Sequence, residues 1–355
     1  MRIFITHVLS HSAGQRHGIS IAATNFSHNL LSGGGFDKCY SILPTFVSET
    51  DGNECPDDIE LVFFKGLRRI GRFGRIASVL IEQWKLFRKI PKNANVWLYN
   101  ITPLNTLLIR LLKRFKPSVR IYPIVLDFTP GIHDKYLPLI NNSDGRVLLA
   151  NSNRFNQINA VCMPGVVPID DYENPLIKQC QATFLLSGKL LPEISMLPTV
   201  LDAFSKIPDA QLIICGQECQ DESQVLETAN RCPNIKYLGN ITFSEYMQLL
   251  HNCTFVLSTR DYTFPENECN FPSKIIEALS HNRIVLSTID YPSLNNINYF
   301  RISHNSNEMA KDIKNIISMP EKELLKYANQ QSAVKILFSV NEWNKVMTNI
   351  EKQKL

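Results

Sequence analysis

Short apolar runs alternate with helical patterns along the whole 355-residue chain, and this alternation restricts the fold more than any other feature. Nearly continuous apolar runs are typical of strands that are buried on both faces of a parallel sheet. Helices connecting such strands must cover those faces, so the pattern predicts an α/β fold. In the first half we expect strands at Ile3–Leu9, Ile59–Phe64, Val96–Tyr99, Val119–Leu126 and Val147–Ala150, and helices at Ile19–Leu31, Phe73–Ile90 and Leu104–Phe115.

The second half repeats this alternation after Pro164–Gln181, a segment rich in Pro, Asp and Asn that is typical of a linker. A chain of this length suits two domains better than one, so we expect domains at residues 1–166 and 182–337. The expected strands are Thr183–Ser187, Gln211–Cys215, Ile235–Leu238, Thr254–Ser258 and Ile284–Ser287, and the expected helices are Met196–Ile207, Ser223–Arg231, Ser244–His251, Ser273–Ser280 and Asn307–Ile317.

The composition indicates a folded protein of the cytoplasm. Apolar residues make up 44% and charged residues 20% of the chain, which excludes a disordered protein. The nine Cys are odd in number and contain no C-x-x-C pair, so we expect reduced thiols. The apolar start Met1–Leu9 is too short for a signal peptide or a membrane span. The His residues of the first loop have no acid at metal-ligand spacing, so we expect no metal.

One ten-residue stretch, Asn270–Leu279, combines a helix start with groups that suit a nucleotide diphosphate. Pro272 and Ser273 fit the first turn of a helix, whose N–H groups and dipole attract anions. Lys274 adds a positive charge there, and Glu277 follows one turn later with a carboxylate that can accept hydrogen bonds from a sugar diol. The alternative is an ordinary capped helix with surface charges, and these residues alone do not decide between the two.

Further landmarks follow the predicted strands in a characteristic order. They are Gly14-Gln15-Arg16-His17-Gly18-Ile19, Ala150-Asn151-Ser152, Met163-Pro164-Gly165-Val166, Leu186-Ser187-Gly188-Lys189-Leu190, Ile214-Cys215-Gly216, Tyr237-Leu238-Gly239, and Phe338–Trp343 at a last helix. With Asn270–Leu279 they resemble glycosyltransferase family 4, whose members retain anomeric configuration and need no metal. The resemblance is good from about residue 145 onward and weak before it, apart from the first strand–loop–helix.

The resemblance implies the GT-B fold, in which two Rossmann-like domains face each other and a C-terminal helix, here about 338–355, crosses back to the first domain. It implies that the second domain binds a nucleotide sugar and that Glu277 binds the ribose. Asp127 is a further candidate for the site because it ends a predicted strand. The alternative, to which we give equal weight, is that Asp127 only caps the turn before Pro130. The implied catalytic residues are Asp127, Lys189 and Lys274, and the implied donor-binding residues are Gly14, Arg16, Gly18, Gly188, Lys189, Glu268, Asn270, Pro272, Ser273, Lys274 and Glu277.

The sequence also departs from the family pattern. Cys269 stands where the first acid of the family's E-x7-E motif is expected, and Ile194 stands where a Lys is usual. Lys274 could supply the missing charge, and Glu266 or Glu268 the missing acid. We expect a hexosyltransferase that uses a UDP-sugar rather than a GDP-sugar, with retention, on a cell-surface glycan or lipid-linked glycan. The alternatives are a nucleotide-sugar epimerase of similar fold and a degenerate, non-catalytic nucleotide-binding subunit.

Charge is concentrated in Lys65–Lys92, which holds nine basic residues and one acid, Glu82. Such a stretch favours an anionic partner, and without a recognition motif for nucleic acid a membrane surface is the better candidate. The apolar residues of Phe73–Phe87 share one helix face, which we expect to lie in the core. We therefore expect a peripheral protein on the inner face of the membrane, with no nucleic-acid partner. Its membrane or acceptor surface is expected to comprise Arg68, Arg69, Arg72, Arg75, Arg88 and Lys89.

Overall fold

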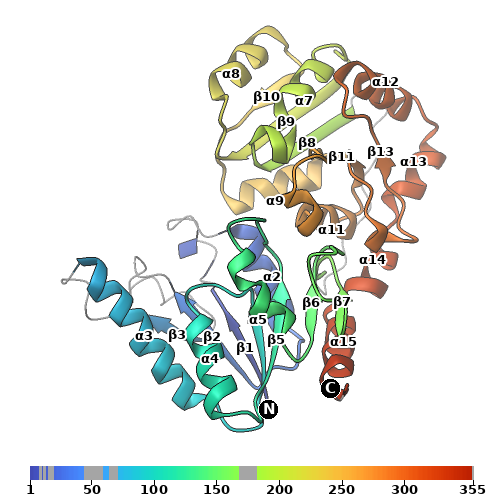
Figure 1. Ribbon diagram of the computed structural model, residues 1–355. Coiled ribbons are helices and arrows are strands. Elements are labelled where there is room, and N and C mark those ends of the chain that lie inside the picture. Colours follow the sequence, from blue (N-terminus) through green and yellow to red (C-terminus); the bar gives the residue numbers. More distant parts are fainter. Residues whose placement is uncertain are drawn as a thin grey trace. The chain divides into compact units, whose positions relative to one another are not determined.

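The computed structural model describes residues 1–7, 10, 13–14, 20–43, 59–63, 71–167 and 182–353. The chain forms two compact units (Figure 1). Unit 1 consists of Met1–Val166, Cys269–Phe271 and Val340–Leu355, and unit 2 consists of Val167–Glu268 and Pro272–Ser339. The second unit is therefore interrupted by a three-residue segment that belongs to the first.

Unit 1 is built on a parallel sheet with the strand order β3-β2-β1-β4-β5-β6-β7 within the described residues. This order, in which the chain starts in the middle and winds outward in both directions, is that of a Rossmann-like domain. The strands are β1 (Arg2–Thr6), β2 (Lys38–Leu43), β3 (Ile59–Phe63), β4 (Asn95–Tyr99), β5 (Arg120–Val125), β6 (Arg146–Leu148) and β7 (Ala160–Cys162). The helices are α2 (Ile21–Leu31), α3 (Gly71–Lys89), α4 (Thr106–Phe115), α5 (Leu137–Asn141) with the 3₁₀ turn η3 (Asp134–Tyr136) before it, and α15 (Val340–Lys352).

Unit 2 repeats the scheme with the parallel order β10-β9-β8-β11-β12-β13. Its strands are β8 (Ala182–Lys189), β9 (Ala210–Gln217), β10 (Ile235–Tyr237), β11 (Phe255–Ser258), β12 (Ile284–Ser287) and β13 (Phe300–Arg301). Its helices are α6 (Pro192–Ser195), α7 (Leu197–Phe204), α8 (Glu222–Arg231), α9 (Phe243–Asn252), α10 (Glu266–Cys269, whose last residue belongs to unit 1), α11 (Ser273–Ser280), η4 (Pro292–Leu294), α12 (Ser306–Ile317), α13 (Glu321–Ala328) and α14 (Gln331–Phe338).

The predicted α/β class and the two Rossmann-like sheets are confirmed, with strands at all ten expected places. Sequence patterns missed β2, β7 and β13. The last two are only three and two residues long, which is too short for a periodicity to register.

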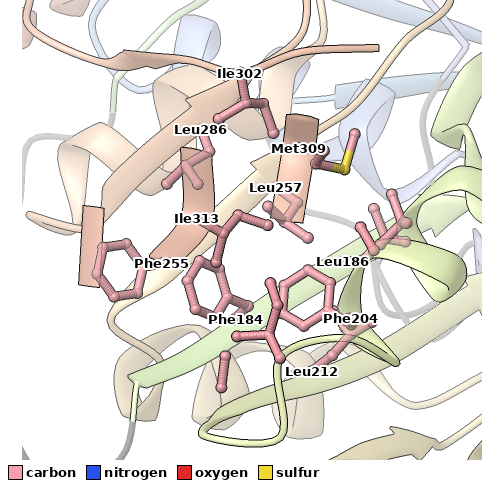
Figure 2. Packing of buried hydrophobic residues seen from close by; sticks show 14 of the residues in the cluster. Phe184, Leu186, Phe204, Leu212, Phe255, Leu257, Leu286, Ile302, Met309 and Ile313 are labelled. Carbon is pink, nitrogen blue, oxygen red and sulfur yellow. The ribbon is translucent and has the colours of Figure 1, made fainter. Parts of the chain in front are cut away.

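The core of unit 2 lies where the apolar strands of the sheet pack against amphipathic helices. Phe184 of β8 stacks on Phe255 of β11 with ring centroids 4.5 Å apart. Phe204 of α7 meets Phe184 edge-on, and Met309 and Ile313 of α12 complete the cluster (Figure 2). Side chains from neighbouring strands and two helices therefore close one face of the sheet.

Helix α15 packs in unit 1 although it is the last helix of the chain (Figure 1). Trp343 is fully buried, its indole Nε1 donates to the carbonyl oxygen of Gly165 at 2.7 Å, and its ring meets Phe26 edge-on at 5.3 Å. Near the end of the helix, Glu351 accepts from Arg2 and from Trp97 Nε1. The expected return of a C-terminal helix to the first domain is thus confirmed.

The expectation that the apolar stripe of α3 lies in the core is wrong for most of its residues, although Phe87 at its end is buried. Phe73 is 82% exposed, and Ile76, Leu80, Ile81 and Trp84 are exposed as well. The helix instead buries Gln83, whose side chain donates to Pro103 O and accepts from Leu108 N. Because this buried amide bonds to α4 and to the loop before it, it fixes the rotation of α3 about its axis. None of the helices in the described ranges combines the length and apolar composition needed to cross a bilayer.

Candidate functional site

The carboxyl ends of β8 and β9 form a glycine-lined edge in unit 2. Gly188 and Gly216 lie opposite each other in the strand register. A Cβ on Gly216 would lie 1.8 Å from the carbonyl oxygen of Gly188, so no other residue fits there. Gly188 has φ +106°, a backbone conformation that also favours glycine. These two positions leave the backbone accessible at the edge where open α/β sheets bind their ligands.

The start of α11 brings positive charge to this edge. Pro272 caps the helix without a side-chain hydrogen bond, and Ser273 is exposed in its first turn, so leading N–H groups are available to an anion. Lys274 Nζ donates to the carbonyl oxygen of Ser187 at 2.6 Å, directly before Gly188. Burial, with a smaller contribution from nearby Arg260, lowers the pKa of Lys274 to about 7. Its amine therefore gains or loses its charge according to what binds beside it.

Glu277 lies one turn further along α11 and is held by a tyrosine. Tyr246 Oη of α9 donates to Glu277 Oε2 at 2.6 Å. Burial, followed by the negative charge of Glu277, raises the pKa of Tyr246 well above its usual value, so the phenol keeps the proton that it donates. One carboxylate oxygen of Glu277 is thus held in place by the protein.

The remaining candidates in unit 2, Lys189 and Glu268, are both exposed. Lys189 is exposed and forms an ion pair with exposed Glu218 at 3.0 Å, so its charge is already matched in this structure. Glu268 is exposed at the end of α10. Among the described residues, no three His, Cys, Asp or Glu side chains are grouped closely enough to hold a metal ion.

Asn270 and Cys269 belong to unit 1, not to the unit that carries Lys274. The Asn270 amide bonds both backbone groups of Phe128, accepting from its N–H at 2.8 Å and donating to its carbonyl at 3.2 Å. Cys269 is buried in the unit 1 core, and its Sγ lies 3.6 Å from Ser152 Oγ. The position where the family pattern has an acid is therefore used for packing in this chain.

A second candidate site is a cavity of about 310 Å³ at the carboxyl ends of β4 and β5 in unit 1. Asp127 is exposed and lines this cavity. Asn100, which has φ +56°, accepts from Leu126 N at 2.7 Å and so shapes the turn that presents Asp127. His133 Nδ1 accepts from Thr129 N at 2.9 Å, which leaves Nε2 to carry the proton of the neutral ring. The lining residues are Asn100, Ile101, Thr102, Pro103, Asp127, Ile132, His133, Lys135 and Tyr136.

Several predicted residues lie outside the described ranges or are only partly described. Arg16, Gly18, Arg68 and Arg69 fall outside them. Arg72 and Arg75 belong to α3 by their backbone. Gly14 is described, and its N–H donates to Ser10 O at 2.8 Å. Arg88 is exposed near the end of α3, and Lys89 pairs with Glu60.

Sequence reasoning did not find Tyr246, which contacts Glu277 across 31 residues of chain. No motif marks this residue. Its spacing of four from buried Leu250 does place both on the inward face of α9, and a tyrosine on such a face needs a partner for its hydroxyl.

Solved structures of glycosyltransferases resemble this chain over nearly its whole length. Anabaena HepE in complex with UDP-glucose matches at 14% identity and a TM-score of 0.64, covering 99% of each chain. The sucrose-phosphate synthase of Thermosynechococcus elongatus matches at 13% identity and a TM-score of 0.68, again over 99% of each chain. WaaB, a lipopolysaccharide outer core galactosyltransferase, matches at 16% identity and a TM-score of 0.62 over 100% of both chains.

These similarities establish the fold: the chain has the α/β architecture of GT-B glycosyltransferases, with two Rossmann-like units. No protein-family profile matches the sequence, and no curated protein is significantly similar to it.

Proposed function

We propose that the protein is a glycosyltransferase that moves a hexose from a nucleotide sugar, preferably a UDP-sugar, to a glycan or lipid-linked glycan. The observation that carries this proposal is the set formed by Lys274, the start of α11 and the Glu277–Tyr246 pair at the glycine edge of β8 and β9. HepE, which shares the fold, was solved with UDP-glucose, and this supports uridine as the base.

The chemistry of these residues suits departure of a nucleoside diphosphate. When the bond from the sugar to the diphosphate breaks, negative charge grows on the leaving phosphate while an oxocarbenium-like centre forms on the sugar. Protonated Lys274 and the first N–H groups of α11 would stabilise that charge. We propose transfer with retention and without a metal, in line with the resemblance to family 4, and activity that persists in EDTA.

The acceptor is proposed to bind in unit 1, at the cavity beside Asp127. The cavity combines a carboxylate, an amide and an imidazole with apolar walls, and such a set can hydrogen-bond sugar hydroxyls and pack against the ring faces. The structural similarity to WaaB, a galactosyltransferase of the lipopolysaccharide outer core, supports a glycan as the acceptor. The excess of basic residues in Lys65–Lys92 supports a cytoplasmic position at the inner face of the membrane, with lipid rather than nucleic acid as the anionic partner.

A panel of nucleotides and nucleotide sugars in thermal-shift measurements tests the donor assignment, because a ligand that binds only the folded state raises the melting temperature. UDP and UDP-hexoses should stabilise the protein most. Release of UDP that requires an acceptor would identify a transferase, whereas interconversion of the donor alone would identify an epimerase. If nucleotides stabilise the protein but the donor is not consumed with any acceptor tested, a non-catalytic binding subunit would be favoured.

Replacing Glu277 by Gln should weaken binding of UDP and uridine alike, because the ribose is common to both. Loss of a charged hydrogen bond costs about 1.5–3 kcal/mol, so the dissociation constant should rise about ten- to a hundredfold. Calorimetric titration measures this change. The control Glu308→Gln, at an exposed position of α12, should bind like the parent. Equal affinity of parent and Glu277→Gln would show that the ribose does not bind here.

Replacing Tyr246 by Phe should weaken UDP binding about five- to tenfold, because the unheld Glu277 must be ordered by the ligand itself. The effect should nearly vanish in a Glu277→Gln background, which identifies a positioning role acting through Glu277. Tyr237→Phe is the matched control, since it removes another Tyr–Glu hydrogen bond, to Glu222 at 3.0 Å, in the same unit. Additive losses in the double variant would contradict the positioning role.

A further inference from the structure

The outward side of α3 in unit 1 carries large apolar side chains that no described part of the chain covers. We name this surface the α3 apolar face and define it by the exposed residues Phe73, Ile76, Leu80, Ile81 and Trp84. Aromatic contacts connect this face with the end of α4 through a buried ring: the Trp84 ring lies 5.3 Å from that of buried Phe87, which lies 6.3 Å from the ring of exposed Phe115. Large apolar side chains that are exposed together on one helix mark an interaction site.

The exposure of this face is built into the packing of α3. The buried side of the helix carries Ser78, Gln83 and Leu86, and buried Ile90 follows directly after the helix. Gln83 makes two hydrogen bonds there, to Pro103 O and from Leu108 N, and turning the apolar face inward would break both. Figure 1 shows α3 beside α4, the helix that contains Leu108. The helix therefore presents its apolar residues outward because a polar residue holds it in that rotation.

The charges around the face select its partner. Helices α3 and α4 together contain a single acid, Glu82, which pairs with Lys85 at 2.6 Å. Exposed Arg88 follows on α3, and exposed Arg110 and Arg114 lie on α4. A helix with Phe, Leu and Trp on one side and Lys and Arg beside them is typical of helices that lie in the interface of an anionic bilayer.

We propose that α3 lies flat in the interface of an anionic membrane, with the α3 apolar face inserted among the acyl chains and the basic residues at the headgroups. This inference rests on the proposed membrane location and deepens it, because charge alone would hold the protein at the headgroups without insertion. Insertion would bring unit 1 to the surface from which a lipid-linked acceptor projects.

The protein contains its own reporter of insertion. Of its three tryptophans, Trp97 and Trp343 are fully buried and Trp84 is 47% exposed. Vesicles of phosphatidylcholine with about one third phosphatidylglycerol should shift the emission of Trp84 to shorter wavelength, and lipids brominated on the acyl chains should quench it. Vesicles of phosphatidylcholine alone should have a much smaller effect.

Two variants separate insertion from attraction. Phe73→Ser/Leu80→Ser should lower partitioning onto anionic vesicles about a hundredfold, since it removes two inserting side chains. Arg88→Gln/Arg114→Gln should lower it about fivefold for each charge removed and reduce its dependence on salt. The matched control Ile158→Ser changes a side chain that is 67% exposed beside β7, at the other edge of the sheet, and should partition like the parent.

The outcomes are distinct. Parental partitioning of Phe73→Ser/Leu80→Ser, or an emission of Trp84 unchanged by anionic vesicles, would overturn insertion. A dimer seen by light scattering in the parent and lost in that variant, without vesicle binding, would identify a second copy of the chain as the occupant and overturn the membrane proposal. Because the vesicles contain no nucleotide or acceptor, failure of the proposed transfer activity would leave these results unaffected.

Discussion

Replacing Lys274 by Met is expected to lower kcat/KM for transfer about a hundred- to a thousandfold while weakening UDP binding only about ten- to a hundredfold. The amine meets the diphosphate in the ground state, but the charge on the leaving phosphate grows as the bond breaks, so the loss is larger in the transition state. Uridine, which lacks the diphosphate, should bind the variant like the parent. Steady-state kinetics and calorimetry measure these three quantities.

The substitution Lys274→Met should also remove the pH dependence of UDP affinity. Because burial lowers the pKa of Lys274 to about 7, the amine loses its charge as the pH rises above that value. A bound diphosphate favours the protonated amine, so UDP affinity should fall above pH 7 and binding there should take up protons. In the unliganded protein the unfolded chain binds more protons between pH 7 and the usual Lys pKa, so burial of Lys274 costs stability at low pH and that cost disappears as the pH rises.

The control for these experiments is Lys311→Met, at an exposed position of α12, which should keep parental kinetics and pH dependence. Lys274→Met should melt at or above the parental temperature without ligand near pH 7, because it no longer buries a charge. If its UDP affinity fell with pH as steeply as that of the parent, another group would be responsible, and the donor diphosphate would not be assigned to this edge of unit 2.

Replacing Trp343 by Ala should destabilise unit 1 by about 3–5 kcal/mol, since the change leaves a large cavity beside Phe26 and removes the hydrogen bond to Gly165. All three tryptophans lie in unit 1, so tryptophan fluorescence reports its unfolding, whereas circular dichroism reports both units. The fluorescence midpoint in urea should fall sharply, and part of the dichroism should persist beyond it. Trp84→Ala, at an exposed position, should have a small effect; similar midpoints for both variants would contradict anchoring of α15 by Trp343.

The sequence predicted those features of the fold that depend on local pattern. Apolar runs such as Val256–Leu257 of β11 and Val285–Leu286 of the neighbouring β12 need only their own residues to be recognised as buried β-structure, and ten strands were found this way. The start of α11 at Ser273 was predicted because Pro272 and the following helical pattern mark it. The glycines that follow the strands were likewise visible as landmarks.

Other features depend on contacts between distant parts of the chain, which no local pattern contains. The periodicity of α3 revealed an apolar face but not which face is covered, and the two hydrogen bonds of Gln83 decide that. Asn270 lies within a helix-start motif, yet its amide bonds Phe128, which is 142 residues away in sequence. Tyr246 was missed because its role exists only through Glu277. Residues of this kind could be found only once the two units were folded.

The return of α15 to unit 1 also has a consequence for biosynthesis. Residues 340–352 leave the ribosome about 170 residues after Val166, which at 5–20 residues per second is a delay of about 10 to 35 s. During that time the strands of the first unit exist without Trp343, Met347 and Ile350, and the apolar surface that these residues cover is open to solvent or to a chaperone. All residues of unit 2 are synthesised before α15. The unit that is synthesised first is therefore the last to be completed.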